Sequence, residues 1–72
     1  MSEDKVYKVI ELVGSSPNSW EDATKAAVAQ ASRSLRDLRI AEVVKLDVRI
    51  EDGMISTYRA RIKLSFKYAE SD

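Results

Sequence analysis

The residues of this sequence that could do chemistry are charged, and many of its cations lie on one stretch of chain. In Thr57–Tyr68 every second residue is polar, and the basic ones are Arg59, Arg61, Lys63 and Lys67. Cations at a spacing of two would let one face of a strand contact nucleic acid. The alternative is a solvated face, or one whose cations form ion pairs between subunits with Glu11, Glu42 and Asp47.

The net charge favours the second interpretation. The chain has 12 Lys and Arg and 12 Asp and Glu, so its formal charge is zero. A neutral chain lacks the field that attracts nucleic acid or an anionic membrane. No exposed aromatic residues are expected between the basic ones, so we expect no nucleic-acid partner.

The missing residue types argue against an enzyme. The sequence has no histidine and no cysteine, which removes the commonest general base, the thiol nucleophile and the thiolate ligands of metals. There is no glycine-rich phosphate loop and no nucleophile motif. The adjacent carboxylates Glu51 and Asp52 fall in an expected exposed turn. We therefore predict a non-enzymatic protein.

The basic residues belong to a predicted strand with one apolar face, made by Tyr58, Ala60, Ile62, Leu64, Phe66 and Tyr68. Such alternation predicts the central strand of a small sheet. An earlier strand, Lys5–Val13, is apolar at both parities, which is typical of a strand covered on both faces. The turn residues of Gly14–Asn18 end it.

A helix is predicted to begin at Ser19, which can cap its first turn. Its buried stripe consists of Trp20, Ala23, Ala27, Val28, Ala31 and Leu35, with Arg33 and Arg36 in the last turns. We interpret Trp20 as a core or interface residue and not as a ligand platform.

From about Arg39, apolar and polar residues again alternate as in a strand. One face is formed by Val44, Leu46, Val48 and Ile50, and the other by Lys45, Asp47 and Arg49. Asp52-Gly53 predicts a hairpin into the last strand. The order β-α-β-β predicts an α+β fold, in which an antiparallel sheet of order 1-3-2 packs on one amphipathic helix. We expect one domain, 1–72, with 69–72 as a frayed tail.

A chain of 72 residues has a small core, and small scaffolds without disulfides usually need another source of stability. We therefore expect self-assembly. No apolar run approaches the roughly 20 residues that span a bilayer, and the opening MSEDKVYK lacks the order of a signal peptide. The sequence predicts a cytoplasmic protein with no membrane partner.

Across almost its whole length the sequence resembles the dodecins, through VYKVIELVGSSPNSWEDA, AEVV and TYRARIKLSFKY in this order and spacing. Dodecins are small β-α-β-β proteins that assemble into hollow dodecamers and typically bind flavins. The resemblance implies a homododecamer that binds, stores or buffers a small ligand or ion. An assembly that has lost its ligand is the alternative.

Two positions depart from the flavin-binding members. Ile40 stands where they carry a tryptophan that stacks on the flavin, and Arg59 where they carry a glutamine that hydrogen-bonds its ring. An aliphatic side chain has no flat face, and a guanidinium donates only. The resemblance therefore implies an altered site, with ligand-binding candidates Ile40, Glu42, Arg59 and Arg61.

The pattern S-P-x-S-W-E with T-Y-R and S-F-K is closer to the flavin-poor branch that includes calcium dodecin. That resemblance implies a calcium site as an alternative to flavin. Calcium takes about six to eight oxygen ligands and needs no histidine. Carboxylates from several subunits could supply them, with Glu11 and Asp47 as the candidate donors.

Overall fold

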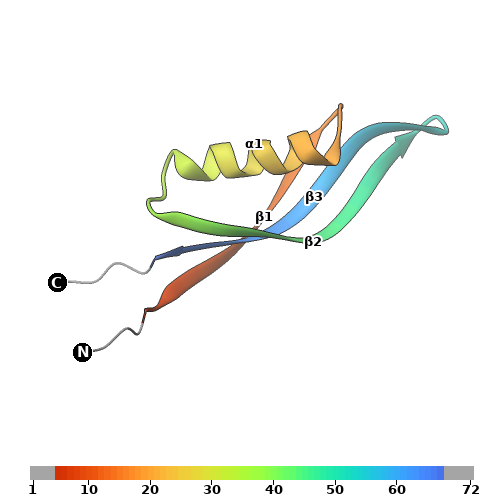
Figure 1. Cartoon of the computed structure of the whole chain (residues 1–72). Helices are drawn as coiled ribbons and strands as arrows, with labels where there is room; N and C mark the ends of the chain where they lie inside the picture. Colours follow the sequence, from red (N-terminus) through yellow and green to blue (C-terminus); the bar gives the residue numbers. More distant parts are fainter. Residues whose placement is uncertain (1–4, 68–72) are drawn as a thin grey trace.

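The computed structural model describes residues 5–67, which form one long three-stranded sheet with a helix on one face (Figure 1). The elements are β1 (Tyr7–Ser16), α1 (Trp20–Ser32), β2 (Leu38–Glu51) and β3 (Met54–Lys67). The strand order is β1-β3-β2, and both pairings are antiparallel. The predicted fold and strand order are confirmed. The predicted tail, 69–72, and the strand end at Tyr68 lie outside the described residues.

The core lies between α1 and the central strand. Ala60, Ile62 and Leu64 of β3 face three alanines of the helix, Ala23, Ala27 and Ala31, and all six are buried. Among residues 5–67, the largest fully buried side chains are Ile62 and Leu64. Because alanine has little volume, the helix lies close to the sheet and the core of one chain is thin.

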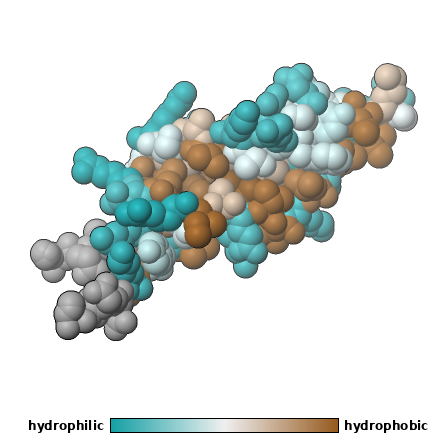
Figure 2. Space-filling view, viewed as in Figure 1, coloured by the Kyte–Doolittle hydropathy of each residue, from teal (hydrophilic) through white to brown (hydrophobic). Residues whose placement is uncertain are grey.

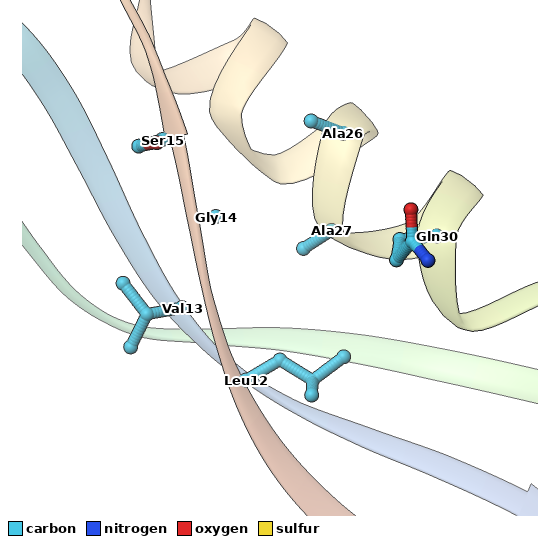
Figure 3. Close-up of a pocket in the computed structure, with 7 residues that line it drawn as sticks. All are labelled: Leu12, Val13, Gly14, Ser15, Ala26, Ala27 and Gln30. Atoms are coloured by element: carbon cyan, nitrogen blue, oxygen red, sulfur yellow. The ribbon is translucent and has the colours of Figure 1, made fainter.

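β1 extends past its predicted end at Val13, and the turn prediction for Gly14–Asn18 is wrong in its first half. Gly14 pairs with Ala60 and Ser16 with Tyr58. A Cβ on Gly14 would collide with the Ala23 carbonyl oxygen and lie 3.0 Å from the Ala27 Cβ. Figure 3 shows the bare backbone of Gly14 opposite α1. This glycine therefore lets a strand pass beneath a helix.

The start of α1 follows the prediction. Ser19 is the N-cap, and its Oγ accepts a hydrogen bond of 3.0 Å from the Asp22 N–H. The helix ends at Ser32, however, so Leu35 and Arg36 lie beyond it, and no basic residue occupies the last turn. The predicted basic end was wrong because the chain already turns toward β2, through Asp37 at a φ of 59°.

Trp20 is half-exposed and anchored, with 38% of its surface accessible. Its indole N–H donates to the Asp47 carbonyl oxygen at 3.0 Å. The ring meets Tyr58 edge-on, with centroids 5.2 Å apart and planes at 81°. Trp20 thus fastens the start of α1 to β2 and β3.

The register of β2 corrects the predicted apolar face. Val43 pairs with Ile62 and Lys45 with Arg61, which leaves Val44 as the extra residue of a bulge. Val43 therefore takes the place on the helix side that the alternation assigned to Val44. The predicted polar face is confirmed, because Lys45, Asp47 and Arg49 pair with Arg61, Arg59 and Thr57, opposite the core.

The predicted hairpin at Asp52-Gly53 is confirmed. Both residues have positive φ values, 54° and 75°, as a tight two-residue turn between strands requires. β3 begins at Met54, earlier than predicted, and its pairing with β1 stops at Tyr58. The β2–β3 hairpin consequently projects beyond β1 and α1 in a molecule that measures 58 × 21 × 14 Å (Figure 1).

Candidate ligand-binding face of the sheet

The sheet face opposite α1, called the open face here, carries all six predicted site residues. Register partners share a face, and faces alternate along a strand. Since Ala60, Ile62 and Leu64 point to the helix, the residues between them point away. The open face therefore holds Arg59 and Arg61 of β3, together with Glu11 opposite Lys63, Ile40 opposite Ser65, Glu42 opposite Lys63, and Asp47 opposite Arg59.

Arg59 and Asp47 form a bidentate ion pair across β3 and β2. The arginine Nε donates to Oδ1 at 2.7 Å and Nη2 donates to Oδ2 at 2.9 Å. This hydrogen bonding lowers the pKa of Asp47 below its ordinary value, helped by the charges of Arg59, Lys45 and Arg61. The same hydrogen bond raises the pKa of Arg59. Two donors on one edge of the guanidinium, Nε and Nη2, are therefore already engaged by the chain itself.

The other carboxylates also lie beside cations. Arg61 Nη1 is 3.7 Å from Glu11 Oε2, with both side chains nearly half exposed. Glu11 and Glu42 flank Lys63 from the two neighbouring strands. Within one chain, the Arg59–Asp47 and Arg61–Glu11 ion pairs each join two strands, and the ion pairs between subunits that the sequence raised as an alternative stay a prediction. Lys63 was not among the predicted site residues, because its position between two carboxylates depends on the register.

The candidate cation ligands Glu11 and Asp47 do not meet within one chain. They lie on β1 and β2, on opposite sides of β3, and contact different arginines. Among residues 5–67 no group of three or more acidic side chains is close enough to hold a metal ion. A calcium site built on them would need oxygen ligands from further subunits.

Apolar side chains accompany the charges on the open face. Tyr7, Val9 and Val13 of β1 are 46%, 54% and 48% exposed, and Ile40 of β2 is 66% exposed. Ser65 donates its hydroxyl to the Ile40 carbonyl oxygen at 3.4 Å. One chain covers β1 on the helix side alone, so the predicted cover of its second face by another subunit stays a prediction. This face can therefore offer both apolar contact and charge to a ligand or a subunit.

Known proteins resemble this chain in sequence and fold, and they identify its family. The family model for Dodecin matches residues 6–69. The chain belongs to the dodecin family. Calcium dodecin of Mycobacterium tuberculosis is 44% identical over 86% of this chain and 87% of its own length. Dodecin of Thermus thermophilus is 36% identical over 93% of this chain and 97% of its own length.

Solved dodecin structures agree with the fold. Dodecin from Streptomyces coelicolor superposes with a TM-score of 0.91 at 37% identity, covering 97% of this chain and all of that one. The structure of the Mycobacterium tuberculosis protein, described as a calcium-chelating antigen with a novel calcium-binding site, has a TM-score of 0.80 and covers 93% of this chain and 96% of its own.

The residues at the two flavin positions do not fit the usual flavin site of the family. Ile40 is exposed but aliphatic, and it cannot stack on a ring as tryptophan does. Arg59 is held by Asp47 and presents no acceptor.

Within the described part of the chain, no helix is long and apolar enough to cross a membrane.

Proposed function

We propose that this dodecin assembles into a hollow homododecamer that binds, stores or buffers a small ligand or ion on its open face, without catalysis. The observation that carries the proposal is the exposure of large apolar side chains on all four elements. They are Tyr7, Val9 and Val13 of β1; Trp20 of α1; Ile40, Val43, Val44, Leu46 and Ile50 of β2; and Met54 and Ile55 of β3.

The thin core supports the assembly. Taking a fully exposed Val, Leu, Ile or Met side chain out of water contributes about 1.5–3 kcal/mol, and these side chains, which are 38–72% exposed, can still gain part of it. One chain can cover few of them, whereas neighbouring copies can cover many at once. Closed symmetric assemblies are the usual outcome for identical subunits.

The proposed ligand contacts are Ile40, Glu42, Arg59 and Arg61 on the open face. Cations outnumber carboxylates there, which favours a ligand with negative charge over a neutral one. The absence of histidine and cysteine from the sequence supports a binding role, as does membership of a family of binding proteins. A cytoplasmic location stays a prediction of the sequence.

Calcium is a second candidate ligand, supported by the 44% identity to a protein named calcium dodecin. Glu11, Glu42 and Asp47 all lie on the open face, where carboxylates of neighbouring copies could converge. In this proposal the ion displaces at least one arginine from its carboxylate, so binding competes with the Arg59–Asp47 and Arg61–Glu11 ion pairs.

Native mass spectrometry of the purified protein tests the assembly and its contents together. A mass of twelve chains is expected, and a folded monomer near the chain mass of 8.1 kDa would refute the proposal. Visible absorbance and metal analysis of the same sample identify copurified flavin or calcium. A dodecamer that carries nothing and responds to neither in titration would be a structural assembly without a ligand.

A further inference from the structure

An apolar groove lies between the start of α1 and β2, on the helix side of the sheet. Its volume is about 450 Å³, and its lining consists of Trp20, Glu21, Thr24, Lys25, Val43 and Leu46. We call it the Trp20 groove. Val43 and Leu46 are each 46% exposed inside it, and Trp20 is 38% exposed. The only charged groups of its lining are the oppositely charged Glu21 and Lys25.

The end of the hairpin carries the most exposed apolar side chains of β2 and β3 apart from Ile40. Within residues 50–55, called the hairpin tip here, Ile50, Met54 and Ile55 are 64%, 72% and 52% exposed. Figure 2 shows this apolar patch at the projecting end, separate from the apolar band along the body. Two-stranded hairpins are marginal in water on their own. The hairpin tip therefore gains the most stability when another surface covers its apolar side chains.

The tip cannot fill the groove of its own chain. Ile50 of the tip and Leu46 of the groove lie on the same strand, β2. Ile50 is four residues further along this strand, in the direction away from the groove. A strand rises about 3.3 Å per residue, so the two are on the order of 13 Å apart and held there by pairing to β3. Whatever fills the groove comes from elsewhere.

We propose that the hairpin tip of one copy inserts into the Trp20 groove of another, a contact that rests on the proposed self-assembly. The tip brings apolar side chains to an apolar lining. Glu51 of the tip forms an exposed ion pair at 3.4 Å with Arg49, the residue just before the tip, and the groove offers Glu21 and Lys25. Opposite charges can therefore meet on both sides of the inserted side chains.

Tip and groove are different surfaces, and in the proposed arrangement they meet head-to-tail. Each copy then has one tip to give and one groove to receive, and the contact repeats until a ring closes. Such a ring would be a building unit of the proposed shell. A reciprocal two-fold dimer, in which the tip of each copy fills the groove of the other, also satisfies both surfaces, and it would cross-link into dimers without longer ladders.

Because the natural chain has no cysteine, introduced cysteines report the contact directly. A double variant, Lys25→Cys with Met54→Cys, is oxidised as the native assembly and resolved on a denaturing gel without reductant. Covalent ladders of two or more chains are expected. The two single variants are expected to stay at the mass of one chain. Gln30→Cys with Met54→Cys is the matched control, since Gln30 is an exposed residue further along the same helix, on the side facing β1.

Native mass measured on the same samples separates the possible failures. An intact assembly whose Lys25/Met54 variant cross-links no more than the Gln30/Met54 control would overturn this contact and leave the proposed function standing. Cross-linking of Met54→Cys alone would show a tip-to-tip contact and overturn it as well. A monomer would overturn both proposals.

Charge reversal supplies a second measurement. Lys25→Glu is expected to raise the concentration needed for half-assembly several-fold, and Glu51→Lys in the same chain is expected to restore it. Restoration requires the two positions to meet. Additive weakening in the double variant would contradict the contact.

Discussion

The Asp47 carboxylate of β2 accepts two hydrogen bonds from one edge of the Arg59 guanidinium, at 2.7 and 2.9 Å, and the main-chain oxygen of Asp47 accepts the indole N–H of Trp20 on the helix side of the sheet. One residue thus connects the candidate ligand face with the helix side. A substitution at Asp47, Arg59 or Trp20 should consequently alter contacts on both faces of the sheet.

The first prediction concerns the dependence of folding stability on pH. Arg59 lowers the pKa of Asp47 in the folded chain, so the pair stabilises the fold at pH values above the unfolded pKa of about 4. That contribution is lost as the pH falls below 4 through the lower, folded pKa. Asp47→Asn should therefore be less stable than the natural chain at pH 7, and the difference should shrink toward zero at lower pH.

Urea unfolding at a series of pH values measures this difference. Asp22→Asn is the control, because it removes an exposed carboxylate that forms no ion pair among residues 5–67. A stability difference for Asp47→Asn that is independent of pH would show that the ion pair does not stabilise the fold.

The second prediction concerns Gly14. An alanine there must push α1 away from β1, because its Cβ would collide with the Ala23 carbonyl oxygen. Overpacking of this kind costs about 1–3 kcal/mol. Ser15→Ala, at the next and exposed position, should cost much less in the same urea unfolding experiment. Equal losses would mean that the helix can move without penalty.

The third prediction concerns Trp20. Trp20→Phe keeps an aromatic ring but loses the 3.0 Å hydrogen bond to Asp47, which should cost about 0.5–1.5 kcal/mol. Trp20→Ala should cost more, yet less than the about 3–5 kcal/mol of a fully buried aromatic, since the ring is partly exposed. If the alanine variant melts and assembles like the parent, Trp20 is not a structural residue.

The fourth prediction concerns flavin. Without a stacking face at Ile40 and with an arginine at position 59, riboflavin should bind weaker by at least about one power of ten than after Ile40→Trp with Arg59→Gln. Fluorescence quenching of riboflavin and of FMN, titrated separately, measures both affinities. Tighter binding of FMN than riboflavin by the natural chain would indicate that its cations contact the phosphate. Tight binding of riboflavin itself by the natural chain would refute our interpretation of Ile40.

The fifth prediction concerns calcium. If carboxylates of the open face hold the ion, Glu11→Gln and Asp47→Asn should each weaken binding about tenfold or more, because calcium loses a charged ligand. Glu21→Gln, on the helix, should leave it unchanged. Isothermal titration with calcium chloride compares the three variants. Unchanged affinity in both open-face variants would place any calcium elsewhere.

The sequence predicted the elements that alternate cleanly and missed those where the pairing register decides. The alternation of β3 was enough to place Arg59 and Arg61 opposite the core. The bulge at Val44 was not predictable, since a bulge changes the face without changing the apolar composition. The extension of β1 through Gly14 was missed for a related reason, because glycine and serine are typical of turns and here serve a close helix contact.

The candidate site was predicted as a set of residues but not as a set of contacts. Glu11, Asp47 and Arg59 all lie on the open face, as the alternation of their strands allows. Which carboxylate meets which cation depends on the stagger of three strands, and one chain's sequence does not encode its neighbours' positions. The groove beside Trp20 was missed because its walls come from a helix and a distant strand.

The thin alanine-lined core has a thermodynamic consequence. Among residues 5–67, the largest side chains that one chain buries fully are Ile62 and Leu64, so a large share of the heat-capacity change should accompany dissociation of the proposed assembly. Folding and association are then one equilibrium, and the melting temperature rises with the amount of protein present. Dilution alone should destabilise this protein, so its abundance in the cell would set how heat-resistant it is.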